Sequence, residues 1–352
     1  MQRRSNPAGD FGHGCVHIVW YTSVWAGLQG PGLSGVCSAM ARPVVIQTEH
    51  LDDEAARWLA ERCDVIALGL GQAGFNDAMA RADAAVVRTY TRVDGAFLAR
   101  GPRLRVVGRA GVGLDNIDLD ACRARGVVVV STPDANTSAV IEYVTAWMLD
   151  ATRPRLFLDG ALPAERWNAL RAELRAPRQL CELTLGIWGL GRIGSGVARV
   201  ARALGMTVIY HDLLHIPVPV RSGAEPVSRA ELCQRADILT VHVDGRPGNA
   251  GLVGPEDFDL MKPGVVFMNT SRGFVIDGPA LARFMAAHPG AMALLDVHEP
   301  EPFGPGYGLL GVPNVKLSPH IASATAMAQR NMSWVVRDIW RVLTGQEPMH
   351  QA

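Results

Sequence analysis

The sequence predicts an α/β protein with parallel sheets, and two observations support this prediction. Short apolar strands alternate with helical segments from about residue 43 onward, and this alternation is typical of parallel sheets covered by helices. A glycine-rich strand–turn–helix unit, residues 185–212, lies near the middle of the chain. The length of 352 residues is enough for two domains.

The first half of the pattern covers residues 43–135. Apolar runs predict strands at residues 44–47, 65–68, 84–88, 104–107 and 127–130, with helices at 52–62, 74–81 and 94–99. Residues 1–41 do not share this pattern, because they are rich in Gly, Ser and aromatic residues. We expect them to form a poorly ordered N-terminal extension rather than a signal or transit peptide.

Two loops in this half follow strands, at the carboxyl ends where α/β sheets bind ligands. One loop contains Arg88, which either binds a substrate directly or is an ordinary surface arginine. The other, residues 108–113, is rich in glycine and could offer main-chain N–H groups to a carboxylate. The alternative for this second loop is an ordinary turn.

The glycine-rich unit predicts a dinucleotide site. Gly189, Gly191 and Gly194 follow a strand at G-x-G-x-x-G spacing and open a helix, whose N-terminal N–H groups attract phosphates. Asp212 ends the next strand, where a carboxylate accepts hydrogen bonds from ribose and repels a 2′-phosphate, so NAD is favoured over NADP. A structural turn, or a different ligand such as a methyl donor, is the alternative.

The second half of the chain continues the alternation. We expect helices at residues 136–151, 230–235, 258–261 and 281–287, a helix with a linker at 154–179, and strands at 185–188, 207–210, 238–241, 265–268, 291–295 and 315–317. The tail, residues 322–343, predicts one long amphipathic helix with an apolar side made of Met327, Met332, Val335, Val336, Ile339 and Val342.

Three ionisable residues follow strands of this half, namely Arg272, Glu301 and His320. A guanidinium binds a carboxylate in a planar fork and polarises a carbonyl. An imidazole exchanges a proton near neutral pH, and a carboxylate beside it fixes its tautomer. Together they suit the reduction of a 2-oxo acid. Taken singly, each has an ordinary alternative as a surface, capping or linker residue.

The chain resembles the D-isomer-specific 2-hydroxyacid dehydrogenase family in five stretches: GRAGVGLDNID (108–118), LGIWGLGRIG (185–194), MKPGVVFMNTSRG (261–273), LDVHEPEP (295–302) and SPHIAS (318–323). The resemblance implies an NAD-dependent oxidoreductase that interconverts a D-2-hydroxy acid and its 2-oxo acid. It implies that Arg272 binds the substrate, that His320 is the acid/base, and that Glu301 is its partner. Glyoxylate, hydroxypyruvate and 3-phosphoglycerate are the first substrate candidates.

The resemblance also implies the remaining contacts of the site. We expect cofactor contacts from Gly189, Gly191, Arg192, Ile193, Gly194, Asp212, Val243, Asn249, Thr270, Arg272, Asp296 and His320. We expect substrate contacts from Arg88, from Arg272 and from the main-chain N–H groups of Val112 and Gly113. A phosphorylated substrate would require further cations, for which Arg88, Arg92 and Arg109 are candidates.

The domain arrangement follows from the same resemblance. It implies two Rossmann-like domains, one flavodoxin-like and one dinucleotide-binding, with the coenzyme domain (136–321) inserted in a substrate domain (42–135 and 322–352). Residues 136–151 and 322–343 would then be the helices that link the domains. Members of the family are usually two-fold dimers, so a homodimer is expected.

Some features depart from the family pattern or limit the function. His242-Val243-Asp244 replaces the more common H-x-P, so contacts near adenosine are expected to differ. Glu301 rather than Gln argues against a formate dehydrogenase, and no regulatory domain is expected after Gln351. An NAD(H)-sensing corepressor-type protein on the same fold is the alternative function.

Composition excludes some further classes. The formal net charge is zero, so we expect no binding to nucleic acid or to anionic membranes. The six cysteines include no C-x-x-C pair, so we expect free thiols in a cytoplasmic protein and no metal site.

Overall fold

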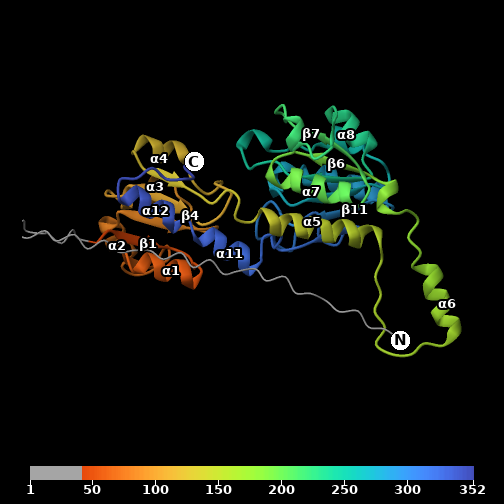
Figure 1. Ribbon diagram of the computed structural model, residues 1–352, viewed down its shortest axis with the longest axis horizontal. Coiled ribbons are helices and arrows are strands. Elements are labelled where there is room, and N and C mark those ends of the chain that lie inside the picture. The colour runs from red at the N-terminus through yellow and green to blue at the C-terminus, as the bar shows by residue number, and fades with distance from the viewer. Residues whose placement is uncertain (1–41) are drawn as a thin grey trace, which may run out of the picture. The chain divides into compact units, whose positions relative to one another are not determined.

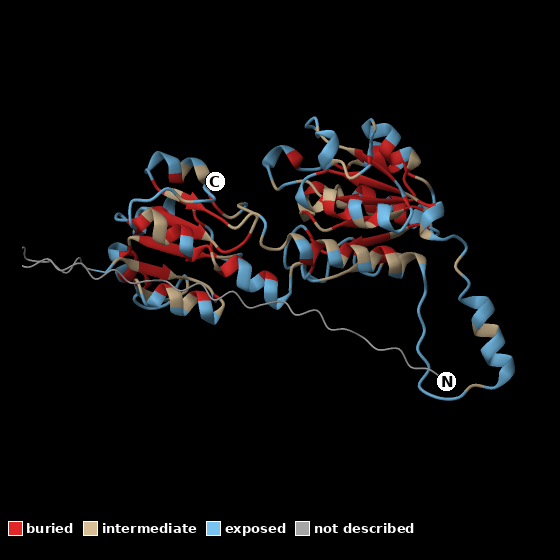
Figure 2. Cartoon of the chain, in the orientation of Figure 1, coloured by how far each residue is buried: buried red, intermediate tan, exposed pale blue. Residues whose placement is uncertain are grey.

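The computed structural model describes residues 42–352, and the prediction for residues 1–41 lies outside the described residues. Parallel strands form two sheets with helices packed on them (Figure 1), which confirms the predicted α/β class. The cores lie between the sheets and their covering helices, where the buried residues concentrate (Figure 2). No helix in this part of the chain has the length and apolar character needed to span a membrane.

The first sheet has the strand order β2-β1-β3-β4-β5. Its strands are β1 (Val44–Gln47), β2 (Asp64–Ala67), β3 (Ala84–Val87), β4 (Val106–Arg109) and β5 (Val128–Val130), and its helices are α1 (Asp53–Ala60), α2 (Phe75–Arg81), α3 (Gly95–Arg100) and α4 (Leu119–Ala124). This is the flavodoxin-like order, in which ligands bind where the chain direction across the sheet reverses, between β1 and β3. The loops after these strands are therefore placed at a ligand-binding edge.

Helix α4 was not expected from the sequence. The Asp118 side chain caps it by accepting a hydrogen bond from the Ala121 N–H at 2.9 Å, and Gly126 follows the helix with φ of +67°. The helix is short and buries only Cys122, so it lacks the apolar stripe by which longer helices are recognised.

The second sheet has the order β12-β11-β10-β9-β6-β7-β8. Its strands are β6 (Thr184–Trp188), β7 (Thr207–His211), β8 (Glu225–Pro226), β9 (Ile238–Val241), β10 (Val266–Asn269), β11 (Met292–Leu295) and β12 (Val315–Leu317). Its helices are α5 (Thr137–Thr152), α7 (Arg192–Ala203), α8 (Arg229–Arg235), α9 (Pro255–Leu260) and α10 (Gly278–Ala287), whereas α6 (Ala164–Glu173) lies away from the sheet (Figure 1) and buries none of its residues. The central order is that of dinucleotide-binding sheets, with the reversal between β6 and β9.

The prediction of one long C-terminal helix is wrong. The structure has two helices, α11 (Ala326–Ser333) and α12 (Val336–Leu343). The Ser333 hydroxyl donates to the Gln329 carbonyl at 2.8 Å and accepts from the Asp52 N–H at 2.9 Å. A serine that bonds back to its own helix bends it, and the contact with Asp52 fixes the break. Met327, assigned to the apolar side, is 71% exposed.

The C-terminal residues pack on the first sheet. Helix α12 contacts β4, where a Cβ on Gly108 would lie only 2.4 Å from the Ile339 Cδ1. Val130 and Gln351 form an antiparallel bridge at the edge of this sheet. Residues that precede the second sheet in the sequence and residues that follow it therefore pack together around the first sheet.

Four of the six cysteines lie in the described part of the chain, and all four are free. Cys63, Cys122 and Cys233 are buried, and burial raises the pKa of the first two thiols to about 11 and that of the third to about 12. These three side chains therefore act as small apolar core residues. Cys15 and Cys37 lie outside the described residues.

Candidate active site

The glycine turn after β6 is shaped by close packing at two of its three glycines. Gly189 has φ of +94°, and a Cβ there would lie 2.7 Å from the His242 carbonyl oxygen. A Cβ on Gly194 would lie 2.2 Å from the Gly189 carbonyl oxygen. Nothing lies within 4 Å of the corresponding position at Gly191, which faces open space. The turn is thus closely packed at Gly189 and Gly194, and it is accessible at Gly191.

Helix α7 begins at this turn without a side-chain cap on its N-terminus. Its first N–H groups are therefore available to an anion. Arg192, expected at the phosphates, forms an ion pair with Asp134 at 2.6 Å. The Asp212 carboxylate accepts hydrogen bonds from the Leu190 N–H at 2.7 Å and the Leu214 N–H at 2.9 Å. Asp212 therefore braces the turn in addition to any contact with ribose.

The other expected cofactor residues differ in whether their polar side-chain atoms already have hydrogen-bond partners. The Thr270 hydroxyl is buried and has no hydrogen-bond partner within residues 42–352. The Asn249 amide instead donates to Asp244, at 2.9 Å to its carbonyl and 3.0 Å to its side chain. The buried Asp296 accepts from the Ile321 and Ala322 N–H groups, each at 2.8 Å. Thr270 is thus open to a ligand, whereas Asn249 and Asp296 also shape their loops.

His320 and Glu301 form a pair. The His320 Nδ1 lies 2.8 Å from the Glu301 Oε2, and the Glu301 Oε1 accepts the His298 N–H at 2.7 Å. Burial raises the pKa of the Glu301 carboxyl, but the hydrogen bonds from His320 and His298 outweigh it, so the pKa lies below its ordinary value. An ionised Glu301 places the hydrogen of His320 on Nδ1 and leaves Nε2 for a substrate.

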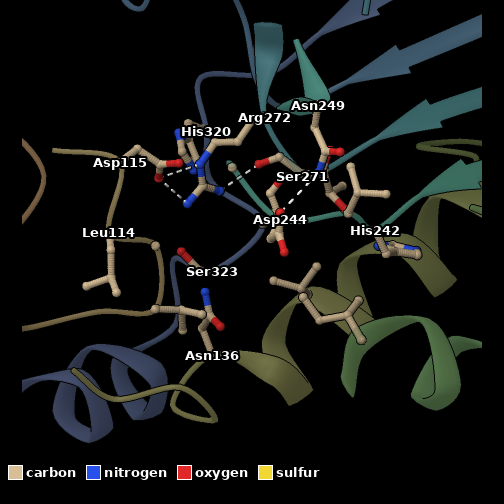
Figure 3. A pocket seen from close by; sticks show the side chains of 18 of the residues that line it. Leu114, Asp115, Asn136, His242, Asp244, Asn249, Ser271, Arg272, His320 and Ser323 are labelled. Carbon is tan, nitrogen blue, oxygen red and sulfur yellow. Dashed lines mark hydrogen bonds and ion pairs between the residues drawn. The ribbon is translucent and has the colours of Figure 1, made fainter. Parts of the chain in front are cut away.

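Arg272 lies on the same side of the cleft as His320 (Figure 3). Its Nε and Nη2 donate to one carboxylate oxygen of Asp115, at 2.8 and 2.7 Å, and its Nη1 donates to the Ser271 carbonyl at 2.7 Å. A Cβ on Gly113 would lie 1.7 Å from the Arg272 Nη2. The loop with Val112 and Gly113, whose N–H groups were expected to bind substrate, therefore lies against Arg272.

The loop that contains Arg88 is fixed by Glu49. The Glu49 carboxylate accepts the N–H groups of four consecutive residues, 88–91, at 2.9 to 3.2 Å. Burial raises the pKa of this carboxyl, and these hydrogen bonds bring it below its ordinary value. The Arg88 side chain donates to the His50 carbonyl at 3.1 Å and lines the cleft. The main-chain N–H of Arg88 is thus hydrogen-bonded to Glu49, while its side chain lines the cleft.

Arg109 is a partly buried cation in this cleft. It forms no ion pair within residues 42–352, and its Nε is buried with no hydrogen-bond partner there. Burial, and then the nearby charge of Arg272, lower the pKa of its guanidinium to about 10, although the charges of Asp115 and Glu49 act in the opposite direction. Arg92, the other candidate cation, is 83% exposed and pairs with Asp94 at 3.9 Å. Arg109 is therefore better placed than Arg92 to meet an anionic ligand.

One cleft of about 2180 Å³ collects nearly all of these residues. It is lined by Arg88, Val112, Gly113, Gly189, Gly191, Arg192, Ile193, Asp212, Val243, Asn249, Thr270, Arg272, Asp296, Glu301 and His320. Gly194 does not line it and packs behind the turn.

Three residues with evident roles in the cleft were not singled out from the sequence: Glu49, Asp115 and His298. Glu49 and Asp115 both follow or lie near strand ends, where the sheet topology concentrates ligand-binding residues. That position was the only available signal. Their partners lie 39 to 42 residues away for Glu49 and 157 residues away for Asp115.

Comparisons with known proteins agree with this geometry. The family model described as D-isomer specific 2-hydroxyacid dehydrogenase, NAD binding domain, matches residues 145–322. The chain is 37% identical to D-3-phosphoglycerate dehydrogenase of Archaeoglobus fulgidus over 73% of this chain and 48% of that protein. It is 36% identical to (S)-sulfolactate dehydrogenase of Chromohalobacter salexigens over 84% of this chain and 96% of that protein.

The solved structures give the same result. A glyoxylate reductase from Paecilomyes thermophila has a TM-score of 0.76 and 27% identity, covering 89% of this chain and 99% of that one. The chain spans about half the length of the phosphoglycerate dehydrogenases that it matches, 48% and 58% for two of them. On the family model and on its match to nearly all of the sulfolactate dehydrogenase, the chain belongs to the D-isomer specific 2-hydroxyacid dehydrogenase family.

Proposed function

We propose that the chain is an NAD-dependent oxidoreductase that interconverts a D-2-hydroxy acid and its 2-oxo acid. The observation that carries this proposal is the Glu301–His320 pair, joined at 2.8 Å, in the same cleft as Arg272. A binding protein that only senses a dinucleotide has no use for an acid–base pair beside a carboxylate-binding arginine. The geometry therefore favours catalysis over the corepressor-type alternative.

Each of the three side chains has a distinct role in this proposal. Arg272 holds the substrate carboxylate and polarises the carbonyl. The Val112 and Gly113 N–H groups, which have no main-chain acceptor within residues 42–352, hold the same carboxylate. His320 gives its Nε2 proton to the oxygen of the 2-oxo acid, or takes a proton from the hydroxyl in the reverse direction. Glu301 keeps Nδ1 protonated and stabilises the imidazolium.

The residues of the second sheet fit a dinucleotide. The open space at Gly191, the uncapped N-terminus of α7 and the unpartnered Thr270 hydroxyl lie in one cleft. The first two suit a pyrophosphate, and Asp212 suits an unphosphorylated ribose. When bound, NAD supplies the donor or acceptor of the hydride. We propose that residues 136–321 form the coenzyme domain and that residues 42–135 and 322–352 form the substrate domain, with Arg272, Glu301 and His320 reaching the substrate from the coenzyme domain.

Among the substrate candidates, we favour an acid that carries a second anionic group, such as 3-phosphoglycerate. Two of the relatives are named for acids that carry a phosphate or a sulfonate. In this chain, Arg109 lines the cleft and forms no salt bridge within residues 42–352, and the charges of Asp115 and Glu49 offset the burial of its guanidinium only in part. A second anion on the substrate would supply a salt-bridge partner for Arg109, and glyoxylate and hydroxypyruvate carry no such group.

An NADH-oxidation assay over a panel of 2-oxo acids tests the proposal. We expect turnover with at least one of them, and we expect the His320→Ala variant to lose turnover while it still binds NADH. Titration of NADH fluorescence measures that binding. Full activity of the variant would refute the role of His320. Absence of turnover with every acid, together with tight NADH binding, would favour the corepressor-type alternative.

A homodimer in the cytoplasm also stays a proposal. Residues 153–174 include α6, which buries none of its residues, and they expose Leu156, Phe157, Leu158 and Trp167. Exposed apolar side chains on one segment are typical of a surface that a partner covers. We propose that a second copy of the chain covers this segment, and light scattering of the purified protein measures the assembly directly.

A further inference from the structure

His298 lies between β11 and Glu301 in the sequence. Its atoms contact Glu301 itself, Ser318 near His320, and Gly273 next to Arg272. We propose that His298 is a positioning residue that holds Glu301, His320 and Arg272 in a common arrangement. The inference rests on the proposed function, because it concerns the geometry of that site. It was not predicted from the sequence.

The first contact is with Glu301. The His298 N–H donates to the Glu301 Oε1 at 2.7 Å, while the other oxygen of the same carboxylate binds His320. The carboxylate is therefore held at both oxygens. A shift of the His298 main chain would rotate the carboxylate away from the imidazole.

The second contact is with the turn that carries His320. The His298 Nε2 lies 2.8 Å from the Ser318 carbonyl oxygen, which also accepts the His320 N–H at 3.0 Å. Because a carbonyl only accepts, the His298 Nε2 carries the hydrogen. His320 has φ of +54°, a conformation that costs free energy in a non-glycine residue and persists only where the surroundings enforce it. The side chain of His298 is one of those restraints.

The third contact is with the residue after Arg272. A Cβ on Gly273 would lie only 2.0 Å from the carbonyl carbon and oxygen of His298. The two main chains therefore lie against each other. His298 thus contacts the segment of each catalytic side chain through a different atom: its N–H for Glu301, its ring for His320, and its carbonyl for Arg272.

The ring nitrogens show which part of the side chain matters. His298 is 5% exposed, and its Nδ1 is buried without a partner within residues 42–352. A buried unpartnered nitrogen is unfavourable. Phe303 and Tyr307 pack edge-to-face on the ring, with centroids 4.7 and 5.6 Å away, and a phenyl ring would fill this place equally well. What a phenyl ring lacks is the donor to Ser318.

Two substitutions separate this donor from the bulk of the ring. His298→Phe keeps an aromatic ring but removes the donor, and His298→Gln restores a donor at a similar distance from the main chain. We expect His298→Phe to lower kcat about 10- to 100-fold, in line with the cost of misplacing a catalytic group. The KM for NADH should stay within about 2-fold, since the dinucleotide-binding residues are untouched. His298→Gln should recover most of kcat.

A matched control is available at His288. This histidine also contacts a carbonyl through its ring, with Nδ1 3.0 Å from the Phe284 oxygen, and its ring packs at a tilt against the Phe284 ring, with centroids 4.4 Å apart. It does not line the cleft. His288→Phe should leave kcat unchanged. Wild-type kcat in His298→Phe, or equal loss in the Phe and Gln variants at position 298, would overturn the proposal.

A second measurement separates this proposal from the proposed function. In protein labelled with ¹⁵N-histidine, the His320 Nδ1 proton, assigned by its loss in His320→Ala, reports the bond to Glu301 without any substrate. We expect a slowly exchanging signal in the wild type and in His298→Gln, and a broadened or absent one in His298→Phe. An unchanged signal in His298→Phe would overturn the positioning role, whatever the wild type does with 2-oxo acids. Absence of wild-type turnover would instead overturn the proposed function.

Discussion

Replacement of Arg109 by Met is the most informative change in the cleft. The guanidinium is buried beside Arg272 and packs over Gly111, where a Cβ would lie 1.3 Å from the Arg109 Nη1. Its single hydrogen bond within residues 42–352, to the Ala110 carbonyl, is long at 3.4 Å. Met is unbranched and of similar length, so it can fill the same space without the charge. Arg109→Met thus tests whether the Arg109 guanidinium binds an anionic group of the substrate.

The structure sets the size of the expected effect on stability. Burial, and then the charge of Arg272, lower the pKa of Arg109 from 12.5 to about 10. At about 1.4 kcal/mol for each pKa unit, the charged form is disfavoured by roughly 3 kcal/mol. Because the group is a base with a lowered pKa, this cost is present at any pH below about 10. We therefore expect Arg109→Met to raise the free energy of unfolding at pH 7 by about 1–3 kcal/mol, as measured by urea denaturation.

The effect on catalysis should depend on the substrate. A hydrogen bond between charged groups is worth about 1.5–3 kcal/mol, or roughly 10- to 100-fold. We expect kcat/KM of Arg109→Met to fall by about this factor for 3-phosphohydroxypyruvate and to stay within about 3-fold for glyoxylate. Arg92→Met is the matched control, since Arg92 is 83% exposed and does not line the cleft. It should change neither stability nor kinetics.

Two results would contradict this reasoning. An equal loss of kcat/KM for both substrates would mean that Arg109 contacts the group they share, the 2-oxo carboxylate, and not a second anion. A lower free energy of unfolding in Arg109→Met would mean that the cation already has a favourable partner in the free protein.

Three further predictions concern the cofactor, the acid–base pair and the glycine turn. Asp212→Asn keeps an acceptor for the Leu190 N–H but removes the charge, so the ratio of kcat/KM for NADPH to that for NADH should rise about 10-fold or more. The lowered pKa of Glu301 means that its carboxylate stabilises the fold above its ordinary pKa of 4.5 and loses this effect as the pH falls through the lowered value. Glu301→Gln should thus cost about 1 kcal/mol at pH 7 in urea denaturation, and progressively less as the pH is lowered below 4.5. Gly194→Ala places a Cβ 2.2 Å from the Gly189 carbonyl oxygen, so it should destabilise the protein by about 1–3 kcal/mol and weaken NADH binding measured by fluorescence titration. An unchanged coenzyme ratio, a pH-independent gap or a fully stable alanine variant would contradict the respective argument.

The strands were predictable because both sheets are parallel and covered on both faces. Such strands are buried on either side and read as short apolar runs. Val44–Gln47, Ile238–Val241 and Val315–Leu317 were predicted with their observed bounds. The two-residue strand Glu225–Pro226 was missed because its residues are exposed at the sheet edge, where no apolar run is required.

The break between α11 and α12 was missed because the local pattern of apolar residues does not reveal it. Its break depends on the hydrogen bond between Ser333 and Asp52, which are 281 residues apart in the sequence. The periodicity of apolar residues runs through the break, because α11 and α12 both bury an apolar side. A tertiary contact therefore decides where one helix ends.

The ionisable residues of the site were more predictable from the sequence than the residues that surround them. Arg272, Glu301 and His320 were expected at strand ends, and the structure brings them into one cleft. Asp115 was not expected, because its role exists only when the loop after β4 meets the loop after β10. Residues that act through a distant partner, such as Asp115, leave no periodic or spacing signal in the chain.

The Asp115 contact bears on which substrate the cleft favours. Arg272 already donates to a carboxylate in the described structure, through Nε and Nη2. A substrate with one carboxylate would exchange one such bond for another, and the exchange by itself yields little net free energy. A substrate with a second anion would gain the contact with Arg109, which forms no salt bridge within residues 42–352 and whose Nε has no hydrogen-bond partner there. The discrimination we propose between phosphorylated and simple 2-oxo acids therefore depends on two arginines in different states: Arg272 already forms a salt bridge with Asp115, and Arg109 forms no salt bridge within residues 42–352.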